Sequence, residues 1–167
     1  MIKKEKNKIG GGEMKTFAVV RVRGNININR GIKDTLKMLN LTKVNHCVFI
    51  PETKEYKGML QKVKDYVTWG EIDSDTLTEM IKERGRLKGD KPVTDKYIEE
   101  NGYISIKKFV DSVIEGEIKY SFLKDVKPVI RLHPPRKGLE GIKRSYAIGG
   151  ALGCRGKEIN ELLRRMI

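Results

Sequence analysis

Positively charged side chains gather in one segment late in the chain, residues 127–157. The segment holds eight Lys or Arg residues against a single acid, Glu140, and it is rich in glycine and proline. Cations neutralise phosphates and glycines let backbone N–H groups approach them, so this composition suits binding to folded RNA, on which Tyr146 could also stack. The candidate RNA-binding residues in the segment are Arg131, Arg136, Lys137, Lys143, Arg144, Arg155 and Lys157.

The alternative interpretation of this segment is a solvated basic loop without a binding function. Charge runs are common on protein surfaces, but such surfaces usually mix both signs, which favours the RNA interpretation. Long loops without secondary structure are usually functional or disordered. We therefore expect residues 127–157 to lie against RNA and to become ordered on binding it.

A second candidate is the strand FAVVRVRG, in which Arg21 and Arg23 share one face with Phe17 and Val19. If helices cover only the other face, the arginines lie on an open face beside an apolar patch, as in an RNA platform. The alternative is an ordinary solvated sheet face, and the pattern alone does not separate the two.

Motifs for catalysis are incomplete. A phosphate-binding loop would need a glycine where Ala151 stands and a hydroxyl residue after Lys157, where the chain has Glu158. The two histidines, His46 and His133, have no carboxylate or thiol at the spacing of a metal site. We therefore predict no enzyme activity, no cofactor and no metal.

The overall composition agrees with an RNA partner. The chain has 167 residues and a formal net charge of +13, which favours a polyanionic partner. It has no apolar run near the ~20 residues that span a bilayer, and no secretory signal. Its two cysteines, Cys47 and Cys154, lie far apart and are expected to be reduced. We expect a cytoplasmic protein without a membrane partner or a small-molecule substrate.

The elements that must position these residues follow from hydrophobic periodicity. Residues 14–73 form an α/β core, in which strands near 17–23, 45–50 and 68–72 alternate with helices near 30–40 and 56–67. This β-α-β-α-β order predicts an α+β fold with helices on one face of the sheet. The segment 68–72 is the weakest of the strands, because it is short and contains a glycine.

The rest of the chain divides into three parts. Residues 74–126 form a helical extension, with helices capped by Asp73 or Ser74, by Thr94 and by Ser105. Residues 127–167 comprise the basic Gly/Pro-rich loop and an amphipathic C-terminal helix. Residues 1–13 are Lys- and Gly-rich, which indicates a disordered tail; an alternative hypothesis places the native start at Met14.

Several runs in order resemble a known family. FAVVRVRG, TLKMLNL and GMLQKVKDYVTWGEI are similar to the large-subunit ribosomal proteins numbered thirty in bacteria and seven in eukaryotes. IKERG, DKYIEENGYISIKKFVDSVIEG, LHPPRKG and INELLRRM extend the likeness to the longer archaeal form. The resemblance covers the chain from Met14 to its end, and it lies in the order and spacing of the runs.

The resemblance implies a ferredoxin-like core with a helical insertion, assembled on 23S rRNA, near the 5S rRNA region and beside neighbouring large-subunit proteins. It matches Arg21 and Arg23 to the family's Arg-x-Arg-Gly strand, and Arg136 and Lys137 to its basic loop. Arg164 and Arg165 match its terminal Arg-Arg-Met. The implied function is that of a structural constituent that binds rRNA in translation; the alternative is a non-ribosomal RNA-binding or ribosome-assembly factor of the same fold.

Overall fold

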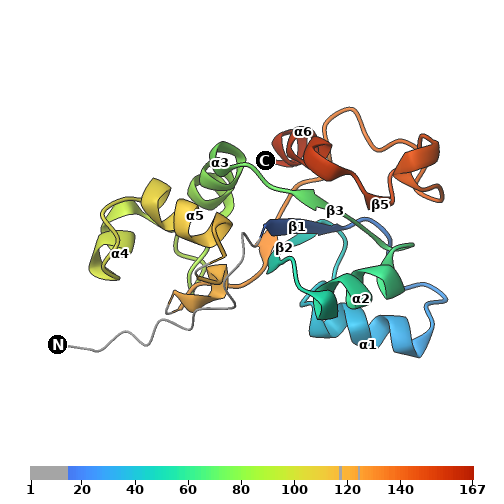
Figure 1. Cartoon of the computed structure of the whole chain (residues 1–167), viewed down its shortest axis with the longest axis horizontal. Coiled ribbons are helices and arrows are strands. Elements are labelled where there is room, and N and C mark those ends of the chain that lie inside the picture. The colour runs from blue at the N-terminus through green and yellow to red at the C-terminus, as the bar shows by residue number, and fades with distance from the viewer. Residues whose placement is uncertain (1–14, 117, 124) are drawn as a thin grey trace.

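A five-stranded sheet lies at the centre of the molecule (Figure 1). The structure is a computed structural model that describes residues 15–116, 118–123 and 125–167. Its strand order is β4-β2-β1-β3-β5. The central strand β1 (Thr16–Arg21) pairs antiparallel with β2 (His46–Pro51) and β3 (Val67–Glu71). The edges are two short strands from the late segment, β4 (Ile130–Arg131) and β5 (Gly153–Cys154). The predicted α+β fold with a ferredoxin-like core is confirmed.

Two helices cover one face of this sheet. Helix α1 (Arg30–Met38) begins after Asn29, and α2 (Lys54–Val63) begins after Thr53; both cap side chains accept a hydrogen bond from a backbone N–H of the first turn. The alternate residues Phe17 and Val19 of β1 pack here against apolar side chains of both helices. Helix α2 ends earlier than its apolar stripe suggested, because Val67 at the end of that stripe belongs to β3.

The other face of the sheet is also covered, so the expectation of helices on one face only is wrong. Ala18 and Val20 are buried there against α3 (Ser74–Arg84), α5 (Ile106–Ile114) and α6 (Ile159–Met166). The helical extension and the C-terminal helix thus bury a sheet face that the first domain alone would leave exposed. In Figure 1 this layer lies on the side of the sheet away from α1 and α2.

The predicted helix starts in the extension are confirmed at two caps. Thr94 accepts a hydrogen bond from the N–H of Tyr97 at the start of α4 (Asp95–Glu100), and Ser105 accepts one from Lys108 at the start of α5. Asp73 precedes α3, but its side chain makes no capping bond. Short 3-10 turns follow at η1 (Tyr120–Phe122), η2 (Tyr146–Ile148) and η3 (Gly156–Glu158).

Gly70, which weakened the sequence evidence for β3, is required by close packing. A Cβ atom at this position would lie 2.0 Å from the carbonyl oxygen of Gly156 and 2.9 Å from Cβ of Ile159. The start of α6 therefore crosses directly over β3 at the one residue that leaves room for it.

Within the described ranges, none of the helices has the length and apolar character to cross a membrane. Nor do the His, Cys, Asp and Glu side chains of these ranges form a group that could hold a metal ion. The expected tail at residues 1–13, and Met14, lie outside the described residues.

Candidate nucleic-acid interface

The basic segment runs across the sheet from one edge to the other. It passes through β4 at the β2 edge and returns to the sheet as β5 at the β3 edge. Between these strands, residues 132–152 form two successive loops rather than one extended connection. Both loops are fixed by contacts to elements that the fold has already placed.

The first loop, residues 133–138, lies on the C-terminal end of α6. The N–H of His133 donates to the carbonyl of Met166 (3.0 Å), and the N–H of Arg136 donates to that of Arg165 (2.9 Å). These bonds satisfy carbonyl groups that the end of a helix leaves without partners. Lys137 and Gly138 turn the chain in the left-handed region, at φ 65° and 72°. The exposed side chains of Arg136 and Lys137 are thus carried by a helix-anchored turn.

The second loop, residues 141–152, is closed by its own backbone. The carbonyl of Arg144 accepts from the N–H groups of Ala151 and Leu152, both at 3.1 Å, and the N–H of Tyr146 donates to the carbonyl of Leu152 at 2.7 Å. Gly150 lies inside the closure, where a Cβ atom would come within 2.1 Å of the Arg144 carbonyl oxygen. The second loop is therefore held in shape by hydrogen bonds among its own residues.

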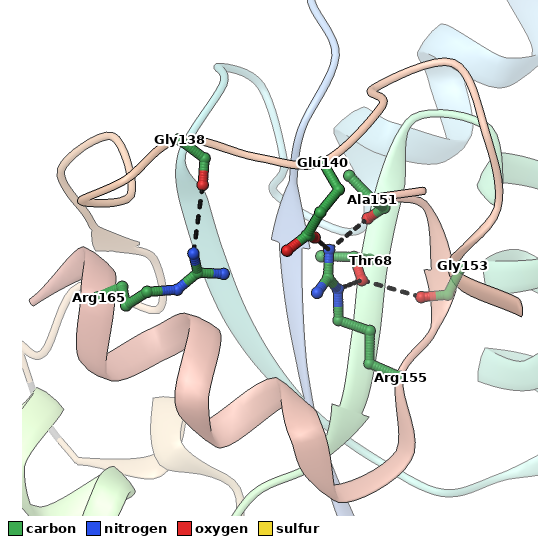
Figure 2. A network of polar contacts seen from close by, with 7 residues as sticks. All are labelled: Thr68, Gly138, Glu140, Ala151, Gly153, Arg155 and Arg165. Carbon is green, nitrogen blue, oxygen red and sulfur yellow. Dashed lines mark hydrogen bonds and ion pairs between the residues drawn. The ribbon is translucent and has the colours of Figure 1, made fainter. Parts of the chain in front are cut away.

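Arg155 holds the second loop against the sheet (Figure 2). Its Nε donates to Oγ1 of Thr68 on β3 (3.0 Å), and its Nη2 donates to the carbonyl of Ala151 (3.2 Å). Thr68 in turn donates to the carbonyl of Gly153 (3.0 Å). The guanidinium also lies over the ring of Tyr146, 4.6 Å from its centroid.

Arg155 is one of the predicted RNA-binding residues, yet its side chain is only 4% exposed. Burial lowers the pKa of its guanidinium, and the carboxylate of Glu140, 3.7 Å away, acts in the opposite direction. Glu140 is the only acid of the segment, and it faces this internal cation. Arg155 shapes the loop, whereas the exposed cations of the loop form no ion pair with this acid.

Arg21 is also buried, which corrects its expected place on an open sheet face. Helices α1 and α2 cover that face, and Arg21 is 1% exposed. Its guanidinium donates to the carbonyls of Arg23 and Leu41 and to Oδ1 of Asn25. Burial lowers the pKa of this guanidinium. The partly exposed Arg23 lies over the ring of Tyr66, at 5.1 Å.

The remaining candidates lie on the surface. They make no ion pair with any carboxylate that the structure describes, so they present unneutralised positive charge. These exposed side chains are Arg131, Arg136, Lys137, Lys143, Arg144 and Lys157. Of the family-matched pair at the chain end, Arg164 is exposed, and Arg165 donates to the Gly138 carbonyl at 3.4 Å.

Sequence reasoning missed a second group of cations on α1. Arg30, Lys33 and Lys37 follow a spacing of three and four residues, which puts them on one side of the helix. Together with Arg21 they line a cavity of about 540 Å³. The spacing was a usable signal, but nothing in the sequence placed the buried Arg21 beside it.

Comparison with known proteins gives concordant matches. Residues 17–67 match the family model described as Ribosomal protein L30p/L7e. The chain is 50% identical over 151 residues to the large ribosomal subunit protein uL30 of Methanocorpusculum labreanum, an alignment that spans 90% of this chain and 99% of the relative. The protein of the same name from Methanococcus maripaludis is 52% identical over 155 residues, with the same coverage.

Proposed function

The chain belongs to the ribosomal protein L30p/L7e family, and from this premise we propose that it binds and stabilises rRNA within the large ribosomal subunit. The family is a structural component of the ribosome, so the prediction of a non-enzymatic role is confirmed. The expected cytoplasmic, ribosomal localisation follows from the same family.

The observation that carries the proposal is the set of exposed, unpaired cations on residues 131–144 and at Lys157. Their supports, α6 and the Arg155 contacts, hold them on a fixed surface, so binding would lose little conformational entropy. The 23S rRNA is the proposed partner, with the 5S rRNA region and neighbouring large-subunit proteins as further contacts. Arg155 supports this surface from within.

The alternative is a ribosome-assembly factor of the same fold. The relatives are named as large ribosomal subunit proteins, which favours a structural constituent of the subunit over an assembly factor. Sedimentation separates the two, because a constituent stays with mature large subunits at stoichiometric amounts in high salt, whereas an assembly factor is lost from them.

The proposed surface is tested by Arg136→Glu combined with Lys137→Glu. We expect weaker binding to large-subunit rRNA and a smaller slope of log affinity against log salt, by about one for each phosphate that the variant no longer binds. Lys82→Glu combined with Lys96→Glu is the control. It makes the same charge change at exposed positions of α3 and α4, where acids such as Glu79 and Glu99 stand nearby in the helix.

Equal slopes for the two double variants would contradict the assignment of this surface. If the unchanged protein had no salt-sensitive affinity for rRNA, the proposed function itself would be overturned.

A further inference from the structure

A cationic cavity lies beside the end of β1, on the face of the sheet that α1 and α2 cover. Its volume is about 540 Å³, within the range of sites that hold small organic groups. Four cations line it, Arg21, Arg30, Lys33 and Lys37, against the single acid Asp34. Ile28, Leu36 and Leu41 supply an apolar wall. The cavity therefore combines a net positive charge with a surface that can take an apolar ring.

Arg21 is the unusual member of this lining. A guanidinium has five N–H donors, and three hydrogen bonds are made by Arg21, with donor–acceptor distances of 2.6–2.8 Å. All three acceptors are neutral, and no carboxylate among the described residues forms an ion pair with it. A buried charge is normally paired, so this cation lacks the anion that its burial calls for.

The three cations of α1 stand in the same situation at the surface. Arg30, Lys33 and Lys37 are exposed and make no ion pair within the part of the chain that the structure describes. Their side of α1 borders the cavity, so their charges add to that of Arg21. An anion that entered the cavity would meet the buried guanidinium of Arg21 and the three exposed cations of α1.

We propose that this cavity is a second RNA-binding site, which takes one backbone phosphate together with its nucleoside. The inference rests on the proposed function and adds a specific contact to it. The phosphate would face Arg21 and the α1 cations, and the ribose or base would lie on the apolar wall.

RNA is favoured over an acidic peptide because the cavity and the interface described above lie near the same end of β1, within reach of one RNA strand. The next residue of the chain, Val22, packs from the other side of β1 against Leu139, Ala151 and Leu152 of the basic segment. The two cationic surfaces therefore lie on opposite faces of the sheet, near the same end of β1. A continuous phosphate backbone could pass from one to the other.

The test is NMR titration of the full chain, observing the Arg21 side-chain Nε–H signal and the backbone amides of residues 25–42. The probes are a six-nucleotide single-stranded RNA, inorganic phosphate and poly-glutamate of matched charge. We expect the RNA to shift these signals at concentrations where poly-glutamate and phosphate leave them unchanged. If poly-glutamate or free phosphate binds here at least as tightly as the RNA, the proposal is overturned.

A paired substitution makes the test quantitative. Arg21→Ala would also remove hydrogen bonds of the core, so the variant is Lys33→Gln with Lys37→Gln, and its control is Lys82→Gln with Lys96→Gln. For large-subunit rRNA in low salt we expect affinity to fall about tenfold and the salt slope to fall by about one or two in the first variant only.

Equal reductions in the two variants, with the unchanged protein still binding rRNA in a salt-sensitive manner, would overturn the cavity as an RNA site and leave the proposed function standing. Absence of rRNA binding by the unchanged protein would instead overturn the proposed function.

Discussion

Replacing Arg155 by methionine separates a cation that shapes the interface from one that binds RNA. Methionine fills much of the same space but cannot make the bonds to Thr68 and Ala151, each contributing about 1 kcal/mol. Nor can it interact as a cation with the Tyr146 ring, which contributes about 1 kcal/mol. The ion pair with Glu140 adds at most about 0.5 kcal/mol, because that carboxylate is 54% exposed and screened by water.

Two further effects set the net cost of this substitution. Thr68 keeps a partner, the Gly153 carbonyl, so its hydroxyl is not left buried and unsatisfied. Removing a desolvated cation returns part of its burial cost, about 1 kcal/mol or more. We therefore expect Arg155→Met to lower the free energy of unfolding by about 2 kcal/mol.

Urea unfolding followed by the fluorescence of Trp69 measures this decrease. Trp69 is the only tryptophan of the chain, and its carbonyl accepts the backbone N–H of Arg155 at 2.8 Å, so it reports on the same region. Lys157→Met is the matched control, since it removes an exposed cation two positions later, and we expect a change within about 0.5 kcal/mol.

The salt dependence of RNA binding should change more in the variant whose stability changes less. Lys157→Met should lower the salt slope by about one, whereas Arg155→Met should weaken affinity with an unchanged slope. Equal stabilities for the two variants, or a lower slope for Arg155→Met, would refute the assignment of Arg155 as an internal support.

Two other predictions concern single sites. Gly150→Ala should destabilise the second loop and weaken rRNA binding, because the new Cβ would lie 2.1 Å from the Arg144 carbonyl oxygen. Gly141→Ala is the control, since the nearest atom to its new Cβ is 3.7 Å away. Similar melting temperatures and rRNA affinities for the two variants would contradict this prediction. A thiol reagent at neutral pH should label one cysteine in the folded protein and both after unfolding, because burial raises the pKa of the Cys47 thiol while Cys154 is exposed; labelling of Cys47 at the rate of Cys154 before unfolding would contradict this.

Elements with strong local signals were predictable from the sequence. Thr94 and Ser105 fixed helix starts because a cap acts on the backbone two or three residues ahead, within the same stretch of chain. The buried stripe of α6, which includes Ile159 and Leu162, followed from helical spacing alone. The second covered face of the sheet did not, because two-residue alternation in β1 is compatible with either one or two layers of helices.

Sequence patterns also could not distinguish the basic residues that are buried from those that are exposed, because burial depends on distant parts of the chain. Arg155 and Lys157 are alike in type and lie two positions apart, yet one is buried and the other exposed. The difference depends on Thr68, 87 positions earlier in the chain, which strand pairing brings beside Arg155. Arg21 depends in the same way on the Leu41 carbonyl, 20 positions later. Composition can identify a polyanion-binding segment because charge adds over many residues, but the role of each cation is decided by the distant groups that the fold places around it. In the basic segment the buried Arg155 therefore sets the shape of the surface and the exposed cations set its charge, which is why stability and salt dependence should respond to different substitutions.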